Sequence, residues 1–146
     1  MTSNLELKPI QVLMVEDNPD DVELTIQAIN GWKVKNKVHV AKDGVEGLTF
    51  LNKEGEYTQA PTPDLILLDL NMPRMDGREF LEQIKADPQH RKIPVVILTT
   101  SELEEDVAKA YDLHANCYIS KPVDLEQFSK VVKAVDQFWF SIVKLP

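Results

Sequence analysis

Cysteine and long apolar runs are scarce in this chain of 146 residues. The only cysteine, Cys117, excludes an internal disulfide and leaves too few thiolates for a metal site, which fits a reducing compartment. The longest apolar runs have the length of strands, so we expect no transmembrane helix. Residues 1–8 have no basic start followed by an apolar core, so we expect no secretory signal. These absences together predict a cytoplasmic protein.

Positive charge is also in short supply. The chain has 16 basic and 24 acidic residues, which gives a net charge of −8. Nucleic-acid phosphates are bound by clustered Lys and Arg, so we do not expect DNA or RNA as a partner. A chain of this length is typical of one domain. We expect a single domain over residues 1–146, with a core at about 9–137 and an aromatic C-terminal extension at 138–146.

Short apolar segments alternate with amphipathic ones along the chain. We predict strands at 10–15, 37–41, 65–68, 93–98 and 117–119. The segment 65–68 is apolar throughout, which is typical of a central strand that is buried on both faces. The alternation predicts an α/β fold with a parallel sheet that helices cover on both sides.

Each of the five predicted strands is followed by a helix start signal. Asn18 precedes a proline, and the other four starts pair a short polar residue with Glu or Gln three positions later. In the second predicted helix, Val45, Leu48 and Leu51 share one face, which we expect to pack on the sheet. The five predicted N-caps are Asn18, Asp43, Asp76, Ser101 and Asp124.

Polar residues follow four of the predicted strands. In a doubly wound sheet the carboxyl ends of the strands meet at one edge, and ligands bind where the strand order reverses. The flavodoxin-like order 2-1-3-4-5 would bring Asp17 next to Asp69. Several carboxylates in one crevice favour a hard divalent cation, and we expect Mg²⁺. The residues concerned are Glu16, Asp17, Asp69, Thr99 and Lys121.

Such a site is suited to phosphoryl transfer. An open metal position beside a carboxylate can bind a phosphoryl oxygen, which makes Asp69 a candidate nucleophile. The ammonium of Lys121 would neutralise a second phosphoryl oxygen, and the hydroxyl of Thr99 would donate a hydrogen bond to a third.

Over nearly its whole length the chain resembles the response-regulator receiver domains. The resemblance rests on an ordered set of motifs rather than on any one of them. These motifs are Val15-Glu16-Asp17-Asn18, the run from Asp64 to Pro73, Met75-Asp76-Gly77, Ile93-Pro94-Val95 with Leu98-Thr99, and Tyr118 with Lys121-Pro122.

The resemblance implies a phosphoacceptor switch rather than an enzyme that turns over a substrate. It implies that a histidine kinase phosphorylates Asp69, and that Asp17, Asp69 and the main-chain carbonyl of Asn71 bind Mg²⁺ with help from Glu16. It further implies that Thr99 and Tyr118 form the switch that alters a protein-interaction face.

Within the family, the chain is similar to the small single-domain regulators that pair with phytochromes. This similarity rests on Gly55-Glu56-Tyr57, Leu98-Thr99-Thr100-Ser101, the segment 113–118 and the aromatic tail. It implies a phytochrome as the histidine kinase. Thr100 departs from the family, which usually has a smaller residue at this position.

Two other functions are compatible with the fold. A Mg²⁺-dependent phosphatase would use a similar nucleophile but needs a second Asp two residues later, where this chain has Asn71. A flavin module needs a phosphate-binding loop after the first strand, whereas Glu16 and Asp17 would repel a phosphate. Phosphatase turnover and a bound flavin chromophore are the observations that would favour these alternatives.

Several acidic and aromatic residues have simpler explanations. Asp20 and Asp21 complement the dipole of the first helix, so we do not include them in the site. Asp64 is interpreted as a strand-entry residue. The consecutive aromatics Phe138, Trp139 and Phe140 cannot all face one core from a helix. We therefore expect a homodimer through the last helix and this tail. Because few residues follow that helix, we expect no output domain. The signal would then pass to a downstream protein partner, which the sequence does not identify.

Overall fold

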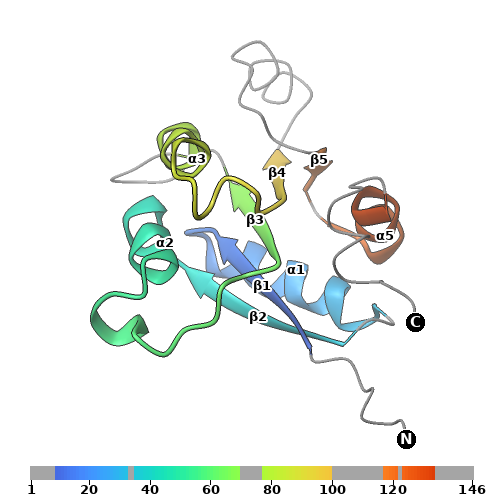
Figure 1. Cartoon of the computed structure of the whole chain (residues 1–146). Coiled ribbons are helices and arrows are strands. Elements are labelled where there is room, and N and C mark those ends of the chain that lie inside the picture. The colour runs from blue at the N-terminus through green and yellow to red at the C-terminus, as the bar shows by residue number, and fades with distance from the viewer. Residues whose placement is uncertain (1–8, 33–34, 70–76, 100–116, 122, 134–146) are drawn as a thin grey trace, which may run out of the picture.

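The computed structural model describes residues 9–32, 35–69, 77–99, 117–121 and 123–133. A five-stranded parallel sheet forms its centre, with the strand order β2-β1-β3-β4-β5 (Figure 1). The strands are β1 (Ile10–Val15), β2 (Asn36–Ala41), β3 (Leu65–Asp69), β4 (Val95–Thr99) and β5 (Cys117–Ser120). The predicted flavodoxin-like order 2-1-3-4-5 is therefore confirmed.

Helices cover both faces of this sheet. They are α1 (Pro19–Asn30), α2 (Gly44–Leu51), α3 (Gly77–Ala86) and α5 (Leu125–Lys133), together with the short 3-10 helix η2 (Gly55–Tyr57). Figure 1 shows α1 and α5 on one side of the sheet, and α2 and α3 on the other. Among the described helices, none is both long and apolar enough to cross a membrane.

Alternate residues of each strand enter separate cores. In β3, Ile66 and Leu68 join the core under α2 and α3, whereas Leu65 and Leu67 join the core under α1 and α5. All four side chains are fully buried. Burial on both faces explains why β3 is apolar without interruption, since side chains alternate across a strand and neither side meets water.

The helix N-termini form the predicted caps where the structure describes them. Asn18 Oδ1 accepts hydrogen bonds from the backbone N–H of Asp20 and of Asp21, at 2.9 and 3.3 Å. Asp124 Oδ1 accepts one from Gln127 N at 2.7 Å. These bonds satisfy N–H groups that have no partner within the helix and fix where α1 and α5 begin.

The buried face of α2 differs from the predicted one. Leu51 is buried and Leu48 packs against the core as predicted, but Val45 is 38% exposed and Phe50 is buried instead. Gly47 permits this orientation, because a Cβ there would lie 2.8 Å from a ring carbon of Phe80 in α3. The helix therefore approaches α3 closely through a glycine, and its buried face is rotated from the one that spacing alone predicted.

In α3, Phe80, Leu81 and Ile84 share one helix face by their spacing, and all three are fully buried. The caps expected at Asp76 and Ser101, with the helix predicted after Ser101, lie outside the described residues, as does the aromatic extension.

Candidate phosphoacceptor site

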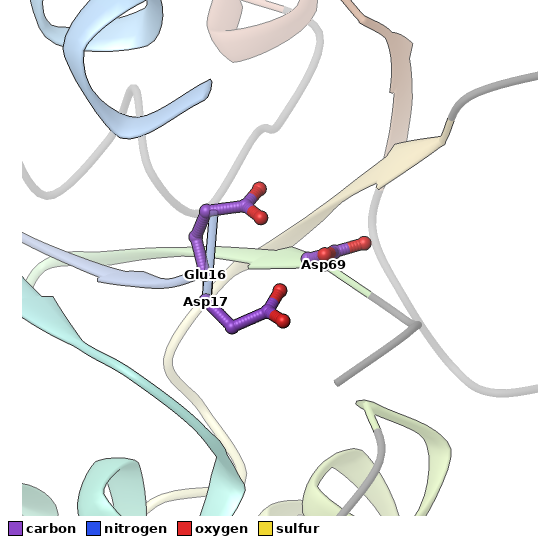
Figure 2. A group of neighbouring side chains, drawn as sticks. All are labelled: Glu16, Asp17 and Asp69. Atoms are coloured by element: carbon purple, nitrogen blue, oxygen red, sulfur yellow. The ribbon is translucent and has the colours of Figure 1, made fainter. Parts of the chain in front are cut away.

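The site lies where β1 and β3 end at the same edge of the sheet. The two strands are parallel neighbours, with Val15 opposite Leu68, so the residues that follow Val15 reach the level of Asp69. Figure 2 shows Glu16 and Asp17 after β1 and Asp69 at the end of β3, with the Glu16 and Asp17 side chains above and below the β3 ribbon and all three carboxylates turned toward the space beyond the strand ends. The parallel register of β1 and β3 thus brings Glu16 and Asp17 next to Asp69, although these residues are about fifty positions apart in the sequence.

Three carboxylates gather at this point. One oxygen each from Glu16, Asp17 and Asp69 can be chosen so that all lie within 4.8 Å of one another. Glu16 and Asp69 are buried, at 2% and 4% exposed, whereas Asp17 faces solvent. Like charges at this separation repel, most strongly between the buried Glu16 and Asp69, so the arrangement favours a cation.

Lys121 supplies one positive charge from the residue after β5. Its Nζ lies 2.8 Å from Glu16 Oε1, 3.0 Å from Asp21 Oδ2 and 3.5 Å from Asp69 Oδ2. Burial lowers the pKa of Lys121, but the hydrogen bonds and charges of Glu16, Asp69 and Asp21 outweigh it and hold the pKa above its ordinary value. Lys121 is therefore an ammonium at neutral pH.

The donor set also fits a divalent metal ion. Glu16 Oε2 accepts a hydrogen bond from Asn18 N at 3.2 Å. Glu16 Oε1 is buried, and the Lys121 ammonium 2.8 Å away is its ion-pair partner. Carboxylate oxygens are the ligands preferred by hard cations, so Glu16, Asp17 and Asp69 are suited to hold one.

Two further predicted residues lie at the same edge. Thr99 is the last residue of β4 and is paired with Ser120, although its side chain is outside the described part. Tyr118 lies opposite Ile97 and is half-buried against the core under α2 and α3. Asn71, Phe138, Trp139 and Phe140 lie outside the described residues.

Asp21 also belongs to this site, which the sequence did not indicate. Asp21 was interpreted only as a helix-dipole residue, yet its carboxylate accepts a hydrogen bond from Lys121. The two residues are 100 positions apart, so no local pattern connects them. The only available signal was that Asp21 lies one helical turn beyond the N-cap, near the edge where Glu16 and Asp17 emerge.

A hollow of about 560 Å³ adjoins the acidic residues on the α1 and β2 side. Its walls combine apolar side chains of α1 with the end of β2 and charged residues at the rim. The lining residues are Glu16, Asp17, Pro19, Val22, Glu23, Ile26, Gln27, Val40 and Lys42.

Comparison with known proteins identifies the family. The model of the response regulator receiver domain matches residues 12–133. The curated response regulator Rcp1 of Synechocystis sp. is 42% identical over 138 residues, which cover 94% of each chain.

Two solved structures extend this result. The bacteriophytochrome response regulator AtBRR is 42% identical with a TM-score of 0.84, covering 90% of this chain and 96% of its own. The phosphorylated cyanobacterial phytochrome response regulator RcpA is 46% identical with a TM-score of 0.74, covering 92% and 96%. This chain therefore belongs to the response regulator receiver domain family, whose members are phosphoacceptor switches that bind a divalent metal at an acidic pocket.

Proposed function

We propose that this protein accepts a phosphoryl group on Asp69 from a histidine kinase and thereby switches a protein-interaction face. The observation that carries the proposal is the convergence of Glu16, Asp17 and Asp69 within 4.8 Å, with the Lys121 ammonium 3.5 Å from Asp69. A nucleophilic carboxylate, a metal-binding set and a fixed cation then occupy one edge of the sheet. Each of these three parts of the site meets a different requirement of phosphoryl transfer.

The proposed step is a displacement at phosphorus. An Asp69 carboxylate oxygen forms the new P–O bond while the P–N bond of the kinase phosphohistidine breaks. The departing imidazole nitrogen retains the electron pair of that bond. The products are an aspartyl phosphate on this chain and an unphosphorylated histidine on the kinase.

The chain's own residues stabilise the charge of the transferred group. Lys121 is in place before the reaction, because its ion pairs with Glu16 and Asp21 already fix its ammonium near Asp69. The hydroxyl of Thr99 is proposed to donate a hydrogen bond to another phosphoryl oxygen. Positive charge that is preorganised in this way requires little rearrangement during transfer.

We propose Mg²⁺ as the metal, held by Glu16, Asp17, Asp69 and the main-chain carbonyl of Asn71. When bound, Mg²⁺ would neutralise the carboxylates and polarise the phosphoryl group. This ligand set is supported by the convergence of the three carboxylates within 4.8 Å and by the exposure of Asp17, through which an ion can enter from solvent. The structure of the related protein Rcp1 has been solved in a Mn²⁺-bound form. That structure is 42% identical to this chain with a TM-score of 0.73, and the match covers 94% of this chain and 99% of Rcp1.

A phytochrome is the proposed kinase, because the similar proteins AtBRR and RcpA are named as phytochrome response regulators. Thr99 and Tyr118 are proposed to transmit phosphorylation to the surface, since both lie on neighbouring strands beside the site. The proposed homodimer would use the last helix and the tail with Phe138, Trp139 and Phe140, and the downstream partner would be a protein.

The test is phosphorylation by a labelled small phosphodonor in the presence of Mg²⁺. The natural chain should be labelled, and Asp69→Asn should not, because an amide cannot form a stable acyl phosphate. Transfer from the phosphorylated kinase domain of a phytochrome, compared with unrelated kinases, tests the proposed partner. Undiminished labelling of Asp69→Asn would contradict the assignment.

A further inference from the structure

Asp21 belongs to the ion-pair network without belonging to the group of carboxylates that can share a metal. Its Oδ2 lies 3.0 Å from Lys121 Nζ, closer than the 3.5 Å between Lys121 and Asp69. Among the described residues, the group whose oxygens approach within 4.8 Å contains Glu16, Asp17 and Asp69 only. Asp21 therefore binds the ammonium from outside the metal-binding group.

Glu16 and Asp69, by contrast, belong to both sets. Each is close to Lys121 and each can contribute an oxygen to a divalent ion. An ammonium and a metal ion at the same carboxylates repel one another, and this repulsion is strong where water is excluded. The Lys121 side chain is only 11% exposed, so solvent screens it little. The position of Lys121 consequently influences how well a metal binds.

We propose that Asp21 is a positioning residue, which holds the Lys121 ammonium on the α1 side of the site, where it also contacts Glu16 Oε1, and leaves the oxygens of Asp69 and Asp17 available to a divalent cation. The inference rests on the proposed function and adds a residue to it. Without the Asp21 carboxylate, Lys121 would retain Glu16 and Asp69 as its partners and would compete more strongly with the metal.

The first turn of α1 is well suited to this role. The N-cap Asn18 accepts hydrogen bonds from the backbone N–H groups of Asp20 and Asp21, so the backbone at Asp21 is fixed. The Asp21 side chain is 31% exposed and the ammonium that it binds is largely buried. Asp21 can thus remain charged at the rim while it contacts a cation inside the site.

The test is the affinity for Mn²⁺ alone, measured from the free-ion signal in electron paramagnetic resonance. Asp21→Asn should weaken Mn²⁺ binding by roughly three- to tenfold, which is modest because Asp21 is partly exposed. Asp20→Asn is the matched control: it removes the same charge from the same helical turn, at an exposed residue. It should change the affinity much less.

A second background shows whether Asp21 acts through Lys121. Lys121→Met should tighten Mn²⁺ binding, because it removes the competing charge. In the Lys121→Met background, Asp21→Asn should have no further effect beyond that of Asp20→Asn. A general charge effect would persist in this background, whereas positioning of the ammonium would not. Asp21→Glu, which keeps the carboxylate, should recover most of the natural affinity.

The outcomes separate this inference from the proposed function. If the natural chain binds no Mn²⁺ and accepts no phosphoryl group, the proposed function itself is wrong. If it does both, and Asp21→Asn equals Asp20→Asn or keeps its effect without Lys121, only the role of Asp21 is overturned. Thermal unfolding checks that each variant is folded, and Asp21→Ser replaces Asp21→Asn if the latter is unstable.

Discussion

Strand β3 has an aspartate at each end, and the two have different surroundings. Asp64, just before the strand, accepts a hydrogen bond from the backbone N–H of Gln11 at 2.9 Å, and its own N–H donates to Gln11 O at 2.7 Å. Asp69, the last residue of the strand, is buried beside Glu16 and Lys121. The first carboxylate joins β3 to β1, and the second forms part of a charged cluster.

A pair of lysines shows the same contrast between the two ends of the sheet. Lys85 donates to the backbone carbonyls of Arg91 and Ile93, before β4 begins, and burial lowers the pKa of Lys85. Lys121 contacts carboxylates after β5, and its pKa is raised. Asp64 and Lys85, near the amino ends of strands, are bound to backbone groups, whereas Asp69 and Lys121, at the carboxyl ends, are bound to other charged side chains. We expect reactivity at the second end only.

Replacement of each of the two lysines by glutamine should produce the largest difference in the rate of labelling. Lys121→Gln removes the fixed charge beside Asp69, and loss of one such group typically slows a reaction by about a hundredfold or more. Lys85→Gln, the matched control, should leave the rate of labelling by a small phosphodonor unchanged. Equal rates for the two variants would contradict the proposed role of Lys121.

The free energy of unfolding should depend on Mg²⁺ through the carboxylates after the strands and not through Asp64. A ligand at a hundredfold excess over its Kd stabilises the folded state by about 2.7 kcal/mol. Such an excess of Mg²⁺ should raise the free energy of unfolding of the natural chain and of Asp64→Asn to this extent. Asp17→Asn should gain much less under identical Mg²⁺, because an exposed ligand is lost. Denaturant titrations with and without Mg²⁺ measure the effect.

Loss of the Asp64 carboxylate should reduce stability without affecting the reaction. A hydrogen bond to a charged group contributes about 1.5 to 3 kcal/mol, and half-burial places Asp64→Ala near the lower limit. The expected loss is therefore about 1 to 2 kcal/mol in a denaturant titration. Labelling per folded molecule should remain at the natural level; a loss of labelling would show that the two ends of β3 are coupled.

A small pH effect should arise near Asp64. His39 Nε2 lies 2.7 Å from Gln11 Oε1, and burial, followed by the charge of Lys37, lowers the pKa of His39. Below its ordinary value of about 6.5, the unfolded chain binds a proton more readily than the folded one. Stability should therefore fall as the pH drops from about 6.5 through the lowered pKa of His39. His39→Gln should reduce this slope in unfolding titrations.

Much of the architecture could be predicted because it depends on local signals. The apolar run of β3, the Asn18 cap and the burial of Phe80, Leu81 and Ile84 follow from periodicity and capping chemistry. The meeting of Glu16, Asp17 and Asp69 follows from strand order and parallel register. Once the order is known, few arrangements of these residues remain.

Contacts between distant elements could not be predicted in the same way. Periodicity shows that Val45 shares a helix face with Leu48, but it does not show which face lies on the sheet. That depends on the close approach of Gly47 to Phe80. Likewise, the charge of Asp21 suits a helix N-terminus, and only the placement of Lys121, just after β5, beside the first turn of α1 reveals the hydrogen bond between the two residues.

The central claim is that Asp69, and not another carboxylate of the cluster, accepts the phosphoryl group. Borohydride reduces an aspartyl phosphate to homoserine, which peptide mass spectrometry can locate after treatment of the phosphorylated chain. We predict homoserine at position 69 and unmodified aspartate at positions 17, 21 and 64. Homoserine at any of those other positions, with Asp69 intact, would contradict this account.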